Sequence, residues 1–146
     1  MGLALNQVDL IVGDMEATIA FYRALGLEIP DGAIWRTATG AHHVDLPMPG
    51  GVILHFDSEA LAGVYDRGWK PPATPGTRTV LTFTVPSRED VDRIHDTLKG
   101  LGHPSAQEPW DAFWGARYAI VCDPDGNHVG IMSPSDPSRR AAPPNL

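Results

Sequence analysis

The chain has a single cysteine, Cys122, in 146 residues, so no internal disulfide can form. Lack of disulfides is typical of proteins from a reducing compartment, and we expect the protein to be cytoplasmic. There is also no apolar run long enough to cross a bilayer, and no charged N-terminal region followed by an apolar core, as a signal peptide would have. These absences predict a protein without a membrane partner.

Positive charge is also scarce, with 11 Lys and Arg against 18 Asp and Glu and a net charge of -7. Nucleic acids and anionic membranes attract clusters of basic residues, so this balance argues against either partner. A hydrophobic content of 42% is ordinary for a globular protein, and the length suits one domain.

Hydrophobic periodicity predicts the same order of elements twice. In the first half, residues 5–12 alternate as a strand does, with Val8, Leu10 and Val12 on one face. Asp14 can cap a helix that ends at Gly26. Further strands are expected at residues 33–38, 41–46 and 52–56.

In the second half we expect a strand at 79–85, a helix that Ser87 and Asp90 cap, and strands at 106–110, 117–122 and 127–133.

The repetition predicts an α+β fold of two βαβββ modules that form a curved mixed sheet around a central cavity. Val12 corresponds to Val85 and Phe56 to Ile131, at offsets of 73 and 75 residues. We expect a single domain over residues 1–134, with halves of about 1–66 and 78–134 and a linker of about 67–77. The Pro-rich residues 135–146 are predicted to be a flexible tail.

Four short motifs carry a family resemblance. Residues 7–14 (QVDLIVGD) and 20–26 (AFYRALG), followed by 113–117 (FWGAR) and 123–127 (DPDGN), resemble the vicinal oxygen chelate superfamily. That group includes glyoxalases, extradiol dioxygenases, fosfomycin-resistance transferases and bleomycin-resistance proteins. The resemblance covers nearly all of residues 5–134. It implies the same fold, a small-molecule ligand and a homodimer.

The resemblance also implies where a divalent metal would bind, since the family's metalloenzymes hold it from the first and last strands of each half. The corresponding positions here are Gln7, His55, Val80 and Gly130. Valine and glycine side chains cannot coordinate a metal, and glutamine is a weak, neutral ligand. We therefore expect no metal cofactor.

A substitute metal site is the alternative to this expectation. A tight turn over residues 47–51 places His43 directly opposite His55, so Gln7, His43 and His55 could form a three-ligand set. A slip of one residue would place His42 on that face instead. His128 has the same strand parity as Gly130 and could share its face.

Aromatic residues point to a planar ligand. Trp35, Trp110, Phe113 and Trp114 lie on segments that the predicted fold places at the cavity wall or mouth. Their faces can stack on a planar molecule, and the missing side chain at Gly130 would widen the cavity. The alternative is that these residues are core or interface aromatics.

Three functions follow from these residues. The first is a metal-free small-molecule binding protein that holds an aromatic or amphipathic ligand in a Trp-lined cavity, through Gln7, Trp35, His43, His55, Trp110, Phe113, Trp114 and Gly130. The second is a metal-dependent lyase, dioxygenase or transferase that uses Gln7, His43 and His55. The third is a metal-free enzyme in which His55 is the catalytic general base, with Asp9, Asp45 or Tyr22 nearby.

Overall fold

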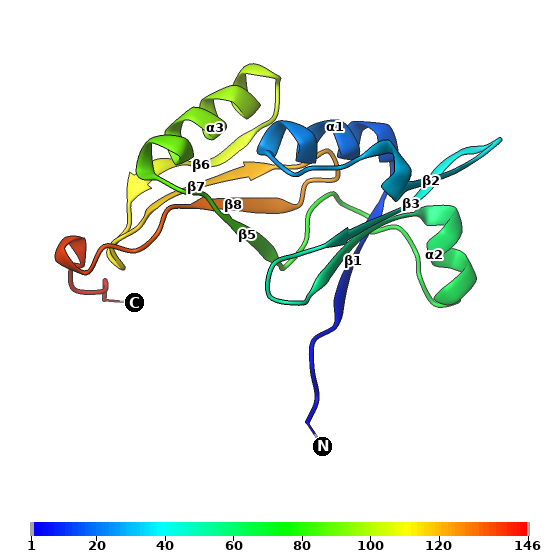
Figure 1. The fold of residues 1–146 in the computed structure, drawn as a ribbon, viewed down its shortest axis with the longest axis horizontal. Helices are drawn as coiled ribbons and strands as arrows, with labels where there is room; N and C mark the ends of the chain where they lie inside the picture. The colour runs from blue at the N-terminus through cyan, green and yellow to red at the C-terminus, as the bar shows by residue number, and fades with distance from the viewer. Residues whose placement is uncertain (1, 146) are drawn as a thin grey trace. The chain divides into compact units, whose positions relative to one another are not determined.

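The computed structural model describes residues 2–145, and the chain divides into two compact units, Met1–Thr74 and Pro75–Leu146. Each unit contains its own four-stranded sheet, in which parallel and antiparallel pairs are mixed (Figure 1). The predicted α+β class and the two βαβββ modules are confirmed. A central cavity shared by the modules stays a prediction. None of the helices within residues 2–145 has the length and apolar character needed to cross a membrane.

The first unit contains four strands, two α-helices and a short 3-10 helix. Its elements in chain order are β1 (Gln7–Val12), α1 (Met15–Leu25), η1 (Asp31–Ala33), β2 (Ile34–Thr37), β3 (Gly40–Pro47), β4 (Ile53–Ser58) and α2 (Glu59–Tyr65). The strand order is β1-β4-β3-β2, so β4 pairs with β1 in parallel and with β3 in antiparallel fashion.

Helix α1 forms where the sequence predicts it and covers one face of this sheet. The Asp14 carboxylate accepts a hydrogen bond from the Ala17 N–H at 3.0 Å, and Gly26 ends the helix at φ +124°. Tyr22 and Phe56 are fully buried, with ring centroids 4.7 Å apart. The face covered by α1 is therefore an apolar core.

The other face of the same sheet is polar. Side chains alternate between faces along a strand, so the neighbours of buried Leu54 and Phe56 point the opposite way. On β4 these neighbours are His55 and Asp57, and His55 is the register partner of Asp9 on β1. Polar side chains from adjacent strands are thereby gathered on one surface.

Helix α2 was not predicted from the sequence. Strand β4 continues to Ser58, whose hydroxyl accepts the Leu61 N–H at 3.1 Å and so caps the helix. The helix has only 7 residues and contains Gly63, so its hydrophobic period is too short to recognise. The Ser58–Glu59 pair, a cap followed by an acidic residue in the first turn, was the available signal.

The second unit repeats this order around its own sheet. Its elements are β5 (Val80–Thr84), α3 (Arg88–Gly100), β6 (Ser105–Asp111), β7 (Arg117–Cys122), β8 (His128–Met132) and η2 (Pro137–Arg139), with strand order β5-β8-β7-β6. The predicted cap of α3 is confirmed, because Ser87 Oγ accepts the Asp90 N–H at 3.1 Å and donates to the Asp90 carboxylate at 2.8 Å.

Part of the C-terminal segment is held against the turn between β6 and β7. The Asp136 N–H donates to the Gly115 carbonyl at 3.0 Å, and the Ala141 N–H donates to the Phe113 carbonyl at 2.9 Å. A Cβ atom at Gly115 would lie 2.4 Å from the Asp136 carbonyl oxygen, so the close approach requires glycine. The flexible tail over residues 135–146 stays a prediction, with its first part held by these two hydrogen bonds, and Leu146 lies outside the described residues.

We expect the substitution Phe56→Ala to lower the free energy of unfolding by about 3–5 kcal/mol, since it opens a cavity under α1. Urea denaturation followed by circular dichroism measures this loss. Leu101→Ala is the control, because Leu101 is 62% exposed and its truncation should cost less than about 1 kcal/mol. Equal losses in the two variants would contradict the described core.

Candidate functional site

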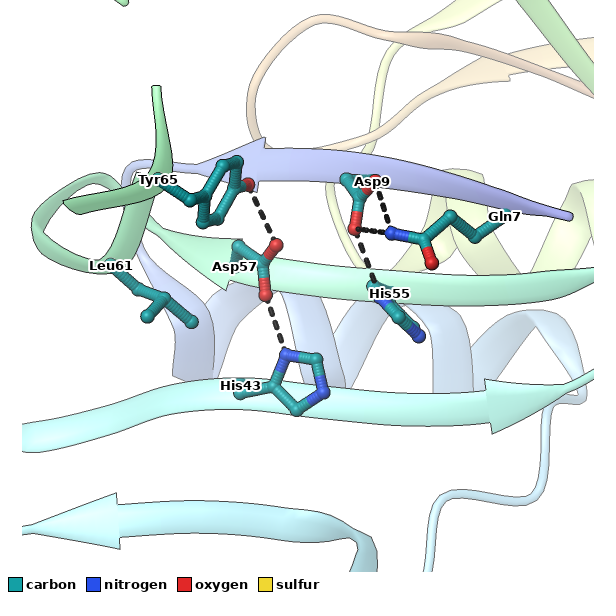
Figure 2. A pocket seen from close by; sticks show the side chains of 7 residues that line it. All are labelled: Gln7, Asp9, His43, His55, Asp57, Leu61 and Tyr65. Atoms are coloured by element: carbon teal, nitrogen blue, oxygen red, sulfur yellow. Dashed lines mark hydrogen bonds and ion pairs between the residues drawn. The ribbon is translucent and has the colours of Figure 1, made fainter. Parts of the chain in front are cut away.

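A pocket of about 290 Å³ lies on the polar face of the first unit's sheet. Its walls come from β1, β3, β4 and α2, and are formed by Gln7, Asp9, His43, His55, Asp57, Leu61 and Tyr65 (Figure 2). The side chains from the three strands point to the same side of the sheet, and α2 closes one end with Leu61 and Tyr65.

The pairing of β3 with β4 differs from the predicted register by two residues. His43 lies opposite Asp57, and His55 lies opposite Asp45. The turn is wider than expected, since the Met48 N–H bonds the Val52 carbonyl at 2.9 Å and Pro47 pairs with Ile53. A shift of two residues keeps each side chain on its face. His43 and His55 are therefore still neighbours, with ring centroids 4.8 Å apart.

His42 points to the opposite face, as this register requires. Its ring nitrogens lie 2.9 Å from Ser58 Oγ and 2.9 Å from the hydroxyls of Thr37 and Thr39. It is therefore a locally hydrogen-bonded residue outside the pocket.

Asp57 connects two elements at the floor of the pocket. It is only 2% exposed, and its two carboxylate oxygens accept from His43 Nδ1 at 2.6 Å and from the Tyr65 hydroxyl at 2.8 Å. A carboxylate only accepts, so the proton of a neutral His43 lies on Nδ1 and its Nε2 carries the lone pair. Burial, together with the hydrogen bond to Asp57, raises the pKa of Tyr65 well above its ordinary value.

His55 lies between two carboxylates. Its Nδ1 is 2.9 Å from Asp9 and its Nε2 is 3.2 Å from Asp45. The Gln7 amide also donates to Asp9, at 3.0 and 3.2 Å to the two oxygens. Burial works to raise the pKa of Asp9, but the hydrogen bonds from Gln7 and His55 outweigh it and hold the pKa below its usual value.

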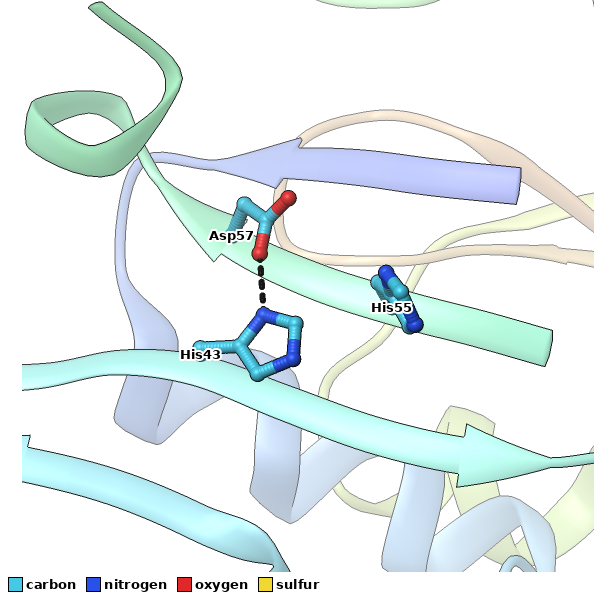
Figure 3. Close-up of side chains that lie close together, drawn as sticks. All are labelled: His43, His55 and Asp57. Atoms are coloured by element: carbon cyan, nitrogen blue, oxygen red, sulfur yellow. Dashed lines mark hydrogen bonds and ion pairs between the residues drawn. The ribbon is translucent and has the colours of Figure 1, made fainter. Parts of the chain in front are cut away.

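His43, His55 and Asp57 form the closest group of potential metal ligands in the described chain. Each offers one donor atom, and these atoms lie within 4.8 Å of one another (Figure 3). Sequence reasoning missed Asp57, because the strand was predicted to end at Phe56. The His-x-Asp spacing, which places both side chains on one face of a strand, was the signal that could have found it.

Two of the three residues that we predicted near the His55 ring contact it. Asp9 and Asp45 contact its ring as expected. Tyr22 does not, because it is fully buried against Phe56 on the opposite face of the sheet. The expectation of Tyr22 beside His55 was wrong, since Tyr22 belongs to the apolar stripe of α1.

The predicted aromatic residues do not line this pocket. Trp35 is 52% exposed on β2 and contacts His42, with ring centroids 5.5 Å apart. Trp114 packs against Trp110, Phe113 and Tyr118 in the second unit, at centroid distances of 5.6, 5.1 and 5.5 Å. A role of this second-unit cluster in ligand binding stays a prediction.

Close packing within the second unit explains why residue 130 is a glycine. A Cβ atom there would lie 2.5 Å from Thr82 Oγ1 and 2.6 Å from the Tyr118 hydroxyl. These two side chains occupy the space that we expected to widen a cavity, so that expectation was wrong. Glycine is needed because Tyr118 crosses directly over the β8 backbone.

Sequence comparison assigns the family. The pattern of the Glyoxalase/Bleomycin resistance protein/Dioxygenase superfamily matches residues 4–131. The chain belongs to this superfamily. A comparison with curated proteins finds no match.

Solved structures of the superfamily share the fold. A glyoxalase-related enzyme from Fulvimarina pelagi is 20% identical, with a TM-score of 0.72 over 90% of this chain and 88% of that one. A glyoxalase/bleomycin resistance protein/dioxygenase family enzyme from Burkholderia phytofirmans PsJN is 19% identical, with a TM-score of 0.70 over 90% and 98%. A lactoylglutathione lyase from Agrobacterium tumefaciens is 22% identical, with a TM-score of 0.60 over 89% and 92%.

The residues at the superfamily's implied metal positions do not fit a metal ion. Val80 has no donor atom, and the space beside Gly130 is taken by Tyr118 and Thr82. Gln7 directs its amide nitrogen at Asp9, and His55 has a carboxylate at each ring nitrogen. This superfamily member therefore lacks the four-residue ligand set at those positions.

We expect Gly130→Ala to lower the free energy of unfolding by about 1–3 kcal/mol, because the added methyl group overpacks the contact with Tyr118 and Thr82. Urea denaturation measures the loss. In a Thr82→Ala background the same substitution should cost less, since the nearest contact is removed. A neutral effect of Gly130→Ala would contradict the packing described.

The raised pKa of Tyr65 predicts a loss of stability at alkaline pH. In the unfolded chain Tyr65 ionises near its ordinary pKa of about 10, whereas in the folded chain it keeps its proton to higher pH. The stabilisation that the Tyr65 hydroxyl contributes is therefore complete below the unfolded-state pKa of about 10, and it is lost as the pH rises from there toward the higher pKa of the folded state. Wild-type stability should fall more steeply above this pH than that of Tyr65→Phe. Urea denaturation at a series of pH values measures the free energy of unfolding of both proteins. The same decrease with pH in the two proteins would contradict this prediction.

Proposed function

We propose that this chain binds a small amphipathic organic molecule in the pocket of its first unit, without the metal set of the superfamily's enzymes. The observation that carries this proposal is the convergence of two His–Asp pairs on a pocket, while Val80 and Gly130 offer no ligand. Leu61 and the Tyr65 ring supply apolar surface beside these polar groups. Such a mixed lining is typical of small-molecule sites.

The size of the pocket limits the ligand. A volume of about 290 Å³ is at the lower end of the range of about 300–1,000 Å³ for small-molecule sites. A single ring with a short polar side chain fits this space better than a large antibiotic or a nucleotide does. The ligand proposed for the first unit is therefore a small one.

Filling the pocket tests this assignment. Leu61→Trp places a large ring on the pocket side of α2, and it should weaken ligand binding by about tenfold or more. Val64→Trp is the matched control, since Val64 lies on the same helix, is 75% exposed and does not line the pocket. Isothermal titration calorimetry with a panel of small amphipathic molecules measures both. Equal binding to the two variants would place the ligand elsewhere.

A metal-dependent enzyme is the second candidate, favoured by the donor atoms of His43, His55 and Asp57 within 4.8 Å of one another. Bonds of about 2.0–2.2 Å from nitrogen or oxygen to zinc require donors no more than about 4.4 Å apart. Side-chain rotations would bring the three atoms within this range, and His55 would have to leave one of its two carboxylate partners. This set takes Asp57 in place of Gln7, predicted from the sequence, because a carboxylate balances the charge of a dication and a neutral amide does not. A metal bound there would act as a Lewis acid.

Metal analysis separates the two candidates. For untagged protein purified without chelator, we expect inductively coupled plasma mass spectrometry to find well below one equivalent of Zn, Fe, Mn or Ni per chain. Soaking in each metal followed by desalting should not change this. A stoichiometric metal in the wild type that is lost in His43→Ala would favour the second candidate and contradict the first.

A further inference from the structure

The hydrogen-bond donors in the pocket wall already have carboxylate partners. The Gln7 amide and His55 Nδ1 donate to Asp9, while His43 Nδ1 and the Tyr65 hydroxyl donate to Asp57. The second nitrogen of His55 faces Asp45 at 3.2 Å. A ligand that enters the pocket therefore meets donors that are already engaged.

The groups that remain open to a ligand are acceptors. They are the Gln7 amide oxygen and the Nε2 of a neutral His43, neither of which has a hydrogen bond among the described residues, and the remaining lone pairs of Asp9. An acceptor surface discriminates against ligands that can only accept, since each such contact would leave two lone pairs facing each other.

The charge of the pocket favours the same class of ligand. Asp9 and Asp57 line the pocket, and Asp45 lies outside its wall but faces His55 at 3.2 Å. His43 and His55 are the basic side chains in contact with these three carboxylates. Even with both imidazoles protonated, the group keeps a negative charge, and neither lysine nor arginine lines the pocket. A cation is therefore attracted, and an anion is repelled.

We propose that the ligand of this pocket carries a protonated amine next to a small apolar group. This inference rests on the proposed function and specifies its ligand. An ammonium group has three N–H donors and no acceptor, so it matches the acceptors around His43 and Asp9. Its apolar part contacts Leu61 and the ring of Tyr65, which close the α2 end of the pocket.

Calorimetry with three matched probes tests the charge of the ligand. The probes are 2-phenylethylamine, 2-phenylethanol and phenylacetate, which share a ring and a short side chain but differ in charge. The amine should bind about tenfold or more tighter than the alcohol, because a hydrogen bond from a charged donor is stronger than one from a neutral hydroxyl, and phenylacetate should not bind. Equal or tighter binding of the alcohol or the acid would overturn the proposal, as would failure of the amine to bind at millimolar concentration.

Two variants locate the ammonium group. Asp9→Asn should weaken amine binding about tenfold, and Asp31→Asn is the control, since the Asp31 side chain is 93% exposed and does not line the pocket. Gln7→Lys provides a second test that does not remove a carboxylate, because its own ammonium group competes for the same acceptors. Unchanged amine affinity in folded Asp9→Asn and Gln7→Lys proteins would overturn the assignment.

A metal ion has the same attraction to these acceptors, so the titrations are repeated with EDTA and with ZnCl₂ alone. Amine binding that persists in EDTA supports the proposal, whereas amine binding that requires Zn²⁺ overturns it.

The position of the pocket and the charge of the ligand are tested separately. If the alcohol or the acid binds and Leu61→Trp abolishes this binding, the pocket assignment is correct and the proposal of an ammonium ligand is wrong. If the amine binds equally to Leu61→Trp, the pocket itself is wrong.

Discussion

The double pairing of β4, parallel to β1 and antiparallel to β3, is the constraint on which the rest of the first unit depends. It places Asp9 beside His55, and His43 beside Asp57, on one face of the sheet. The same pairing turns Leu54 and Phe56 to the other face, where they pack under α1. One central strand therefore supplies both the core and the polar surface, because its side chains alternate.

The buried carboxylate of Asp57 couples the site to the stability of the unit. A buried charge costs several kcal/mol unless partners compensate it. His43 from β3 and Tyr65 from α2 provide this compensation, and they connect the sheet to the helix that closes the pocket. The residues that form the pocket thus also hold its walls together, so the site and the local fold are not independent.

The two modules use corresponding positions differently. In the first, the strand pair β1–β4 carries Gln7 and His55 on an open polar face. In the second, the pair β5–β8 carries Val80 and Gly130, and the space beside Gly130 is filled by Tyr118 and Thr82. The two modules share their backbone order, but these two positions of the second module offer no side-chain donor atom to a metal ion. Superfamily membership alone therefore does not imply a metalloenzyme here.

The sequence alone determined the order of the strands and of helices α1 and α3, the helix caps at Asp14 and Ser87, and the faces of β1 and β4, because periodicity and capping are local properties. It also placed His43 and His55 on one face. Only the tertiary structure decided that His43 pairs with Asp57, that Ser58 starts α2, and that Tyr118 covers Gly130. A strand register shifted by two residues has the same alternation of side chains, so only the turn geometry and the packing of distant residues can distinguish the two.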